Sequence, residues 1–195
     1  MIFGSYPIEA PQLVKRLNEH ATRIVKPHEG TEAWTIAIKR ALQEIAVECR
    51  CKCLCTDKSM KQSEFMLDAV WWQEDQTGAA AVLAAECEWA SWERKAERRA
   101  NVVEHDFEKL LQFKAPMKLM IFEPNTLETR IAIHRRFEEY LRRFRQHVAG
   151  ELYVFVDFSY GSCFSYVCEI NRDGRNEELS LTPMNTESRD ILNAA

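Results

Sequence analysis

Apolar residues recur at helical spacing in the first part of the chain and predict two helices there. Residues 13–24 carry an apolar side chain every three or four positions, and Pro27 ends this stripe. A second stripe covers residues 34–45, and Thr31 is placed to cap the helix that carries it. The chain is therefore expected to begin with two amphipathic helices.

Three segments with strand character follow, and short polar stretches join them. Residues 51–55 alternate cysteine with other residues, residues 65–72 are rich in aromatic and apolar side chains, and residues 80–89 are mainly apolar. The polar stretches at 57–63 and 73–78 are typical of turns. Because these connections are short, the three strands are expected to form an antiparallel meander.

The next two elements predict a crossover. An apolar stripe that starts near Trp92 indicates a helix that runs to about Phe113, and Pro116 opens a continuous apolar strand at residues 117–122. A strand that is reached through a helix lies parallel to the strand before it. The strand at 117–122 is therefore expected to extend the meander in the parallel direction.

Another long helix and two strands complete the pattern. Asn125 and Glu128 have the spacing of a capping box, and Gly150 is placed to end the helix that they open. Residues 152–158 and 163–170 then have the composition of two strands around a tight turn.

This order predicts an α/β fold: a mixed central sheet, made of a three-stranded antiparallel meander and a parallel strand, with helices on both faces. The chain has 195 residues, which suffices for one domain with its own core. We expect a single α/β domain over residues 1–175, with its core at about 31–122, and a polar C-terminal tail over residues 176–195.

Composition narrows the function mainly by exclusion. The formal net charge is −4, so any contact with nucleic acid requires a local basic surface. No segment reaches the ~18 apolar residues that a membrane span needs, and residues 1–15 lack the pattern of a signal peptide. The seven cysteines are odd in number and accompany no secretory signal, so reduced thiols are expected. These features predict a cytoplasmic protein without a membrane segment.

Three acidic residues lie inside apolar strand segments. Glu86 and Glu88 are two residues apart, so both side chains leave the same face of a strand, and Asp68 lies in the preceding strand segment. Pairing of the two strands would bring Asp68 beside Glu86. Carboxylates this close raise each other's pKa, and a divalent cation such as Mg²⁺ relieves the repulsion. The alternative to a metal site is that these acids lie on the solvent-exposed face of a half-exposed sheet.

The order of a helix, three meander strands, a helix and a parallel strand, with Asp68 on the second strand and Glu86 on the third, resembles the PD-(D/E)XK nuclease superfamily and its restriction-endonuclease-like fold. Residues 31–122 cover that core. The resemblance implies that Asp68, Glu86 and also Glu88 hold Mg²⁺ or Mn²⁺, although Glu88 stands where lysine is usual. It also implies hydrolysis of a phosphodiester in DNA or RNA by metal-activated water.

The lysine that this family usually carries on the strand has a candidate replacement in the following helix. Lys109 is that candidate, with Lys95 and Arg99 as rivals for the same role. A pairing of Lys109 with Asp106, three residues earlier on the helix surface, is an equally good interpretation.

Two further groups of residues are candidates on weaker signals. Glu44 and Glu48, on the second predicted helix, are candidates for an additional carboxylate. Arginine suits phosphate contacts because of its planar fork. The arginines considered for nucleic-acid contact are Arg94, Arg98, Arg99, Arg135 and Arg142. Glutamates are interleaved with them, which is equally typical of a salt-bridged, solvated helix face.

Four cysteines alternate at the first strand segment: Cys49, Cys51, Cys53 and Cys55. Structural zinc sites usually combine a Cys-x₂₋₄-Cys pair with a second pair elsewhere in the chain. The alternation lacks that pattern, so we interpret these residues as small buried side chains.

Two functions remain. The first is a Mg²⁺-dependent nuclease. The second is a catalytically inactive protein of the same fold that binds a partner, which the acidic net charge and the absence of lysine at position 88 favour. Cutting both strands of a duplex would further require a partner or a homodimer.

Overall fold

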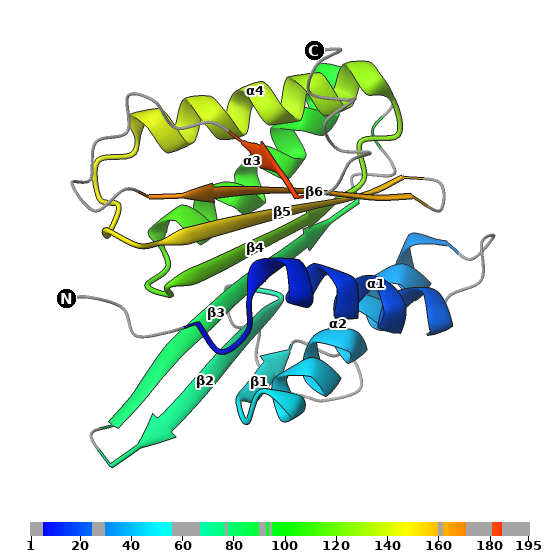
Figure 1. Ribbon diagram of the computed structural model, residues 1–195. Helices are drawn as coiled ribbons and strands as arrows, with labels where there is room; N and C mark the ends of the chain where they lie inside the picture. The colour runs from blue at the N-terminus through cyan, green and yellow to red at the C-terminus, as the bar shows by residue number, and fades with distance from the viewer. Residues whose placement is uncertain are drawn as a thin grey trace.

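Across the residues that the computed structural model describes, seven strands form one mixed sheet, in the order in which they occur along the chain (Figure 1). The strands are β1 (Lys52–Cys55), β2 (Ala69–Asp75), β3 (Gly78–Glu88), β4 (Met117–Phe122), β5 (Leu152–Ser159), β6 (Ser162–Glu169) and β7 (Thr182–Pro183). β1, β2 and β3 pair antiparallel, β3, β4 and β5 pair parallel, and β6 and β7 are antiparallel again. The predicted meander and the parallel crossover are both confirmed.

Four helices cover this sheet in the part of the chain that the structure describes, which comprises residues 6–24, 30–55, 67–76, 78–89, 93, 95–159, 162–170 and 181–184. α1 (Ala10–Ile24) and α2 (Thr31–Glu48) lie on one face, and α3 (Ala96–Gln112) and α4 (Leu127–Arg143) lie on the other (Figure 1). The α/β class with helices on both faces is therefore confirmed. None of these helices is long and apolar enough to cross a membrane.

The alternation of side chains along the strands divides the core into two layers. On one face of the sheet, Ile38 and Leu42 of α2 pack against strand residues such as Leu83. On the other face, Phe107 of α3 packs against strand residues such as Phe155. All six residues of β4 are buried. Because β4 is covered on both faces, its apolar run is continuous rather than alternating.

Buried ion pairs tie the second layer to the sheet. Lys118 of β4 is 1% exposed, and its ammonium group donates to Glu151 Oε1 and to the Tyr153 hydroxyl, both at 2.9 Å. Arg130 of α4 forms an ion pair with Asp157 of β5, which is fully buried. A buried charge is tolerated only when it is paired and hydrogen-bonded. These pairs therefore fix the position of α4 and of the start of β5 on the sheet.

The β2–β3 hairpin differs from the sequence prediction at both of its ends. A turn is expected at residues 73–78, but β2 continues to Asp75, which pairs with Gly78 of β3. The last residues of β2 are polar because they are exposed, and exposure does not interrupt the backbone ladder. At its other end β2 starts at Ala69, so Asp68 lies in a bend just before the strand. The part of the predicted strand at residues 65–66 lies outside the described residues.

α4 begins and ends elsewhere than the sequence predicts. Its cap is Thr126, whose Oγ1 accepts a hydrogen bond from the Thr129 backbone N at 3.1 Å. Asn125, the predicted cap, instead has a positive φ of 62°. The helix ends at Arg143 rather than near Gly150. The Thr126 hydroxyl directly precedes the helix and satisfies the free backbone N–H of Thr129. It therefore takes the role that the predicted capping box gave to Asn125.

The predicted polar tail also contributes to the sheet. β7 pairs with β6 through Thr182 and Pro183, and Leu181 is 4% exposed. A short apolar contact is therefore present inside the segment 176–195. The sequence pattern does not reveal this contact because the apolar residues around β7, Leu181 and Met184, are too few to show a periodicity.

The first prediction concerns the second core layer. Phe107 is fully buried, and its ring lies 4.6 Å from that of Phe137 and 5.5 Å from that of Phe155. We expect Phe107→Ala to lower the free energy of unfolding by about 3–5 kcal/mol, because the packing neighbours cannot fill the space. Urea denaturation measures the change. Leu127→Ala, at a residue that is 47% exposed, is the control and should cost less than about 1 kcal/mol.

Candidate active site

Glu86 is a buried carboxylate near the end of β3. Alternate residues of the strand, Leu83, Ala85 and Cys87, belong to the core layer under α1 and α2. Glu86 therefore points to the opposite face, toward α3, where its side chain is 4% exposed. In the sheet it is paired with Met120 of the parallel strand β4. Glu86 is therefore not on a solvent-exposed face of the sheet, which was the alternative interpretation of this acid.

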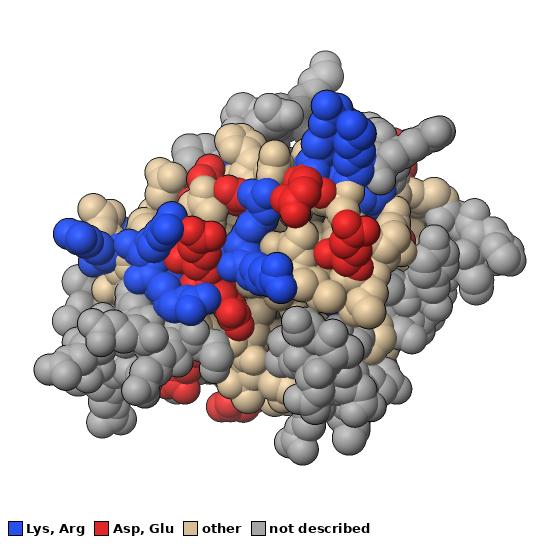
Figure 2. Space-filling model, turned by 90° about the horizontal axis from the view of Figure 1, so that it is seen from above, with Lys and Arg blue, Asp and Glu red and all other residues tan. Residues whose placement is uncertain are grey.

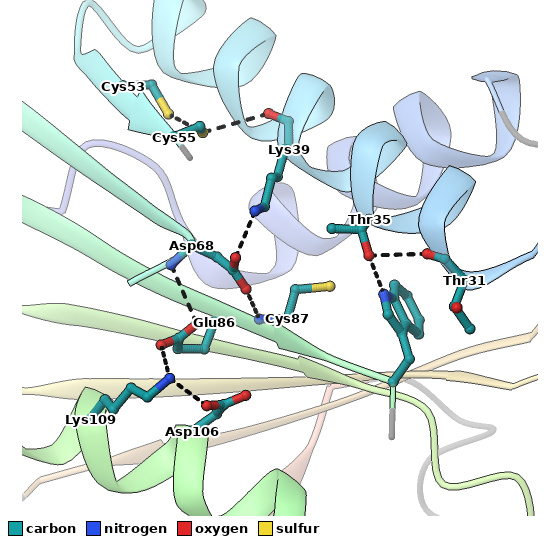
Figure 3. Close-up of polar contacts among 11 residues, drawn as sticks. Thr31, Thr35, Lys39, Cys53, Cys55, Asp68, Glu86, Cys87, Asp106 and Lys109 are labelled. Atoms are coloured by element: carbon teal, nitrogen blue, oxygen red, sulfur yellow. Dashed lines mark hydrogen bonds and ion pairs between the residues drawn. The ribbon is translucent and has the colours of Figure 1, made fainter. Parts of the chain in front are cut away.

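Asp68 lies beside Glu86, as hairpin pairing predicts. Ala69 pairs with Ala85, and Asp68 directly precedes this pair. The Asp68 backbone N donates to Glu86 Oε2 at 3.3 Å, and the Cys87 backbone N donates to Asp68 Oδ2 at 3.0 Å (Figure 3). Asp68 precedes the first residue of β2, so it does not take part in the backbone ladder opposite Cys87. Its carboxylate accepts the hydrogen bond from the Cys87 backbone N in place of a strand carbonyl.

Lys109 approaches Glu86 from α3. Its Nζ lies 3.3 Å from Glu86 Oε1 and 2.5 Å from Asp106 Oδ1, one turn earlier on the same helix (Figure 3). The two sequence interpretations of Lys109, a lysine at the site and a partner of Asp106, are therefore both present in one arrangement. Asp106 fixes the ammonium group so that it faces the buried glutamate.

A second lysine, Lys39, reaches the site from α2 on the other face of the sheet. Its Nζ lies 2.7 Å from Asp68 Oδ1 (Figure 3). One turn earlier on α2, the hydroxyl of Thr35 accepts a hydrogen bond at 2.7 Å from the indole of Trp89, which follows β3. This bond holds α2 against the end of β3 and so positions Lys39.

Lys39 is not among the residues that the sequence pattern predicts for the site. The signal that could have revealed it is its helical spacing. Leu42 and Ala46, three and seven residues further on, are both buried. A lysine at that spacing lies beside the apolar stripe, so its side chain must find a buried or half-buried partner.

The environment of Glu86 strongly favours its protonated form in the absence of a cation. Burial, followed by the charges of Asp68 and Asp106, raises the pKa of Glu86 to about 9, although Lys109 opposes the shift. Burial alone would lower the pKa of Lys109, but its hydrogen bond to Asp106 and the charge of Asp106 oppose burial, and the pKa is raised. Lys109 therefore stays protonated at neutral pH, and the neighbouring Glu86 carboxyl group also keeps its proton.

Glu88 lies further along β3 than Glu86 does. It leaves the same face of β3 two residues later, at the last position of the strand, where it pairs with Phe122. Across the described residues, no three His, Cys, Asp or Glu side chains lie in an arrangement that could hold a metal ion. The acids that the structure brings together are Asp68, Glu86 and Asp106, and the last of these already contacts Lys109.

The remaining candidates for catalysis lie elsewhere. Glu44 and Glu48 face α1: Glu44 Oε2 is 2.6 Å from His20 Nδ1, and Glu48 Oε2 is 2.8 Å from Arg16 Nη2. Lys95 is exposed and precedes α3. It is fourteen positions from Lys109 along the helix, a rise of about 21 Å, so the two side chains cannot contact the same group.

The structure corrects the prediction that Arg99 contacts nucleic acid. It is 5% exposed, and its guanidinium donates to the carbonyl oxygens of Trp89, Glu93 and Glu123 at 2.9–3.3 Å. These bonds hold the loops that follow β3 and β4 to the start of α3. A guanidinium that is buried and bonded in this way has no surface for a phosphate. Arg94 lies outside the described residues.

The basic residues of α4 alternate with acids on the surface. Figure 2 shows this face, where positive and negative side chains are interspersed. Arg142 lies 3.5 Å from Glu138, and Arg136 forms ion pairs with Glu97 and Glu104 of α3. Arg98 and Arg135 are exposed. The face that Figure 2 shows therefore has the character of a salt-bridged, solvated surface rather than of a continuous basic patch.

Comparison of the chain with protein-family models, with curated proteins and with solved structures found no match. Two adjoining carboxyl groups, one buried and one half-buried, lie between two lysines that come from opposite faces of the sheet.

The pKa of Glu86 generates a prediction for the metal-free protein. Between about pH 4.5 and pH 9 the native state keeps a proton that the unfolded chain has lost, so rising pH favours unfolding. We expect this group to lower the free energy of unfolding by up to about 1.4 kcal/mol per pH unit in that window. Urea denaturation in a metal chelator, from about pH 6 to about pH 8, measures the slope.

Glu86→Gln cannot ionise and should flatten this dependence. Glu97→Gln, at a side chain that is 76% exposed, is the matched control and should keep the wild-type slope. Parallel slopes for wild type and Glu86→Gln would show that Glu86 is already ionised at neutral pH.

Proposed function

We propose that this chain is a Mg²⁺- or Mn²⁺-dependent nuclease of the PD-(D/E)XK type, which hydrolyses phosphodiester bonds in DNA or RNA. The observation that carries the proposal is the buried Glu86 carboxylate, which adjoins Asp68 and faces the ammonium group of Lys109. The element order from α2 to β4, a helix, three meander strands, a helix and a parallel strand, supports it.

The residues present fit a hard divalent cation. Oε1 of Glu86 is buried and accepts no hydrogen bond from the described residues, although Lys109 lies 3.3 Å away. A buried carboxyl group with a raised pKa and an oxygen without a hydrogen bond is stabilised by a cation in place of its proton. Mg²⁺ commonly uses only one or two carboxylates and completes its coordination with water and substrate phosphate. Asp68 and Glu86 would supply those two carboxylates.

The location also suits a ligand. Glu86 lies toward the carboxyl end of β3, which is parallel to β4 and β5. In open α/β sheets, ligands bind outside the carboxyl ends of the parallel strands. Lys109 is the most exposed member of the cluster, with 34% of its side chain accessible, so its ammonium group can meet a substrate that approaches from the α3 side.

The roles of the chain's residues follow from these contacts. A bound Mg²⁺ would supply a Lewis acid that lowers the pKa of water and neutralises charge on the transferring phosphoryl group. Asp68 and Glu86 would hold the cation, and Lys39 would keep Asp68 in place. Lys109 would stabilise the negative charge that develops in the transition state or orient the attacking water, because its raised pKa keeps it protonated.

A second candidate function is a catalytically inactive protein of this fold that binds nucleic acid or another partner. The observation in its favour is the charge balance, since Lys39 and Lys109 already pair with Asp68 and Glu86. Cation binding separates the two functions. An active site should gain thermal stability from Mn²⁺, whereas an inactive one should not.

The experiment incubates the purified protein with single-stranded and double-stranded DNA and RNA, with Mg²⁺, with Mn²⁺ or with a chelator. We expect cation-dependent cleavage, and we expect Asp68→Asn and Glu86→Gln to lower its rate by about 100-fold or more while the fold remains intact. Glu88→Gln is the matched control on the same strand and should retain most of the activity. Equal activity in all three variants would contradict the assignment.

The two lysines of α3 provide a further test. Lys109→Ala should reduce the cleavage rate by about 100-fold, because it removes the cation that faces Glu86. Lys95→Ala, at the exposed start of the same helix, should change it by less than about threefold. Single-turnover kinetics at saturating Mg²⁺ measures the difference. The reverse order would place the substrate phosphate at the start of α3.

A further inference from the structure

Two of the alternating cysteines are in direct contact. Cys53 and Cys55 lie on the same face of β1, and their sulfur atoms are 3.1 Å apart (Figure 3). All seven cysteines of the chain are free thiols in the structure. We propose that Cys53 and Cys55 form a reversible disulfide within β1 when a small-molecule disulfide oxidises them. Formation of this disulfide does not require the proposed nuclease activity.

The backbone geometry allows this bond. Residues two apart in a strand have Cα atoms about 6.6 Å apart, which lies within the range of about 4.4–6.8 Å that disulfides span. Among the described strands, β1 lies at the edge of the sheet and pairs with β2 alone, so no described strand bonds to its outer edge and a local distortion there breaks no ladder. Closing the bond requires the two sulfur atoms to move together by about 1 Å.

A neighbouring pair with the same spacing lacks this contact. The sulfur of Cys51 faces the carbonyl oxygen of Cys49 at 3.5 Å, and Cys49 caps the end of α2 rather than belonging to the strand. Identical sequence spacing therefore gives two different arrangements. The chain provides its own control for the claim that contact, rather than spacing, decides which pair oxidises.

The reaction is a thiol–disulfide exchange in two steps. The thiolate of Cys53, the more exposed of the two, attacks one sulfur of the small disulfide; a mixed disulfide forms and one small thiolate leaves. The thiolate of Cys55 then attacks the Cys53 sulfur, the Sγ–Sγ bond forms, and the second small thiolate leaves. The two cysteines lose two electrons and two protons, and the small disulfide gains them as two thiols.

The exchange should be slow near neutral pH. The hydrogen bond with Cys55, and then burial, raise the pKa of the Cys53 thiol well above its ordinary value, so little thiolate is present. The bond is therefore expected to follow the prevailing thiol–disulfide balance over long times rather than to respond quickly.

The pair also adjoins the candidate active site. The Cys55 thiol lies 3.9 Å from the backbone oxygen of Lys39, the residue whose ammonium group holds Asp68 (Figure 3). An oxidised Cys55 has no thiol proton to donate to that oxygen. A disulfide in β1 would thus change a contact of α2 at the same residue that contacts the carboxylate.

The experiment uses the full chain and glutathione disulfide as the oxidant. The protein is equilibrated in mixtures of reduced and oxidised glutathione, free thiols are blocked with an alkylating maleimide, and trypsin then cleaves after lysine and arginine. Cys53 and Cys55 are the only cysteines of the peptide at residues 53–58, whereas Cys49 and Cys51 fall in two separate peptides. Mass spectrometry can therefore assign each disulfide without ambiguity.

We expect the peptide 53–58 to appear lighter by two hydrogen atoms and without maleimide, and a reducing dithiol should restore it. Its oxidised-to-reduced ratio should exceed that of the Cys49–Cys51 pair by about tenfold or more at the same glutathione balance. Cys53→Ser should abolish the product, and Cys49→Ser should leave it unchanged.

Three outcomes would overturn the proposal. In the first, both cysteines remain alkylated while other thiols of the chain oxidise. In the second, Cys49 and Cys51 become linked as readily. In the third, only mixed disulfides with glutathione form at Cys53 or Cys55. Circular dichroism of each variant establishes that it is folded before the comparison is made.

Discussion

β3 pairs antiparallel with β2 and parallel with β4, and the positions of the site residues depend on these two pairings. On one edge β3 pairs antiparallel with β2, and the short connection places Asp68 beside Glu86. On the other edge it pairs parallel with β4, which requires a crossover through α3. The crossover helix necessarily returns over the sheet face that Glu86 occupies, and it carries Lys109. The carboxylates and their lysine are therefore consequences of how one strand is paired.

Burial of the Glu86 carboxylate sets the electrostatics of the site. Three acids, Asp68, Glu86 and Asp106, lie with two lysines in a half-buried cluster. Taking a carboxylate out of water is costly, so the group must hold a proton, pair with a cation or bind a metal. The raised pKa of Glu86 shows that Lys109 compensates for burial and for the neighbouring acids only in part. A divalent cation would complete the compensation, which is why the same geometry supports a metal-dependent activity.

Two buried arginines outside this cluster stabilise the fold. Arg99 and Arg130 are buried, and each holds separate segments together through hydrogen bonds or an ion pair. The outer face of α4 neutralises its arginines with glutamates of the same helix and of α3. A high content of arginine alone therefore does not indicate a surface that binds nucleic acid, because these arginines bond to loops and to acids of neighbouring helices.

The sequence by itself determined the order and type of the elements, because hydrophobic periodicity reports which faces are buried. It also predicted that pairing of these two strands would bring Asp68 beside Glu86, since hairpin pairing of adjacent strands leaves few registers that bury both apolar faces. The ends of β2 and α4 were not determined, because polar residues at an exposed strand end and alternative caps cost little. Only the tertiary structure decided that Lys39 contacts Asp68 and that Arg99 is buried. Those outcomes depend on how helices lie across the sheet, and contacts between residues distant in sequence leave no periodic signal in the chain.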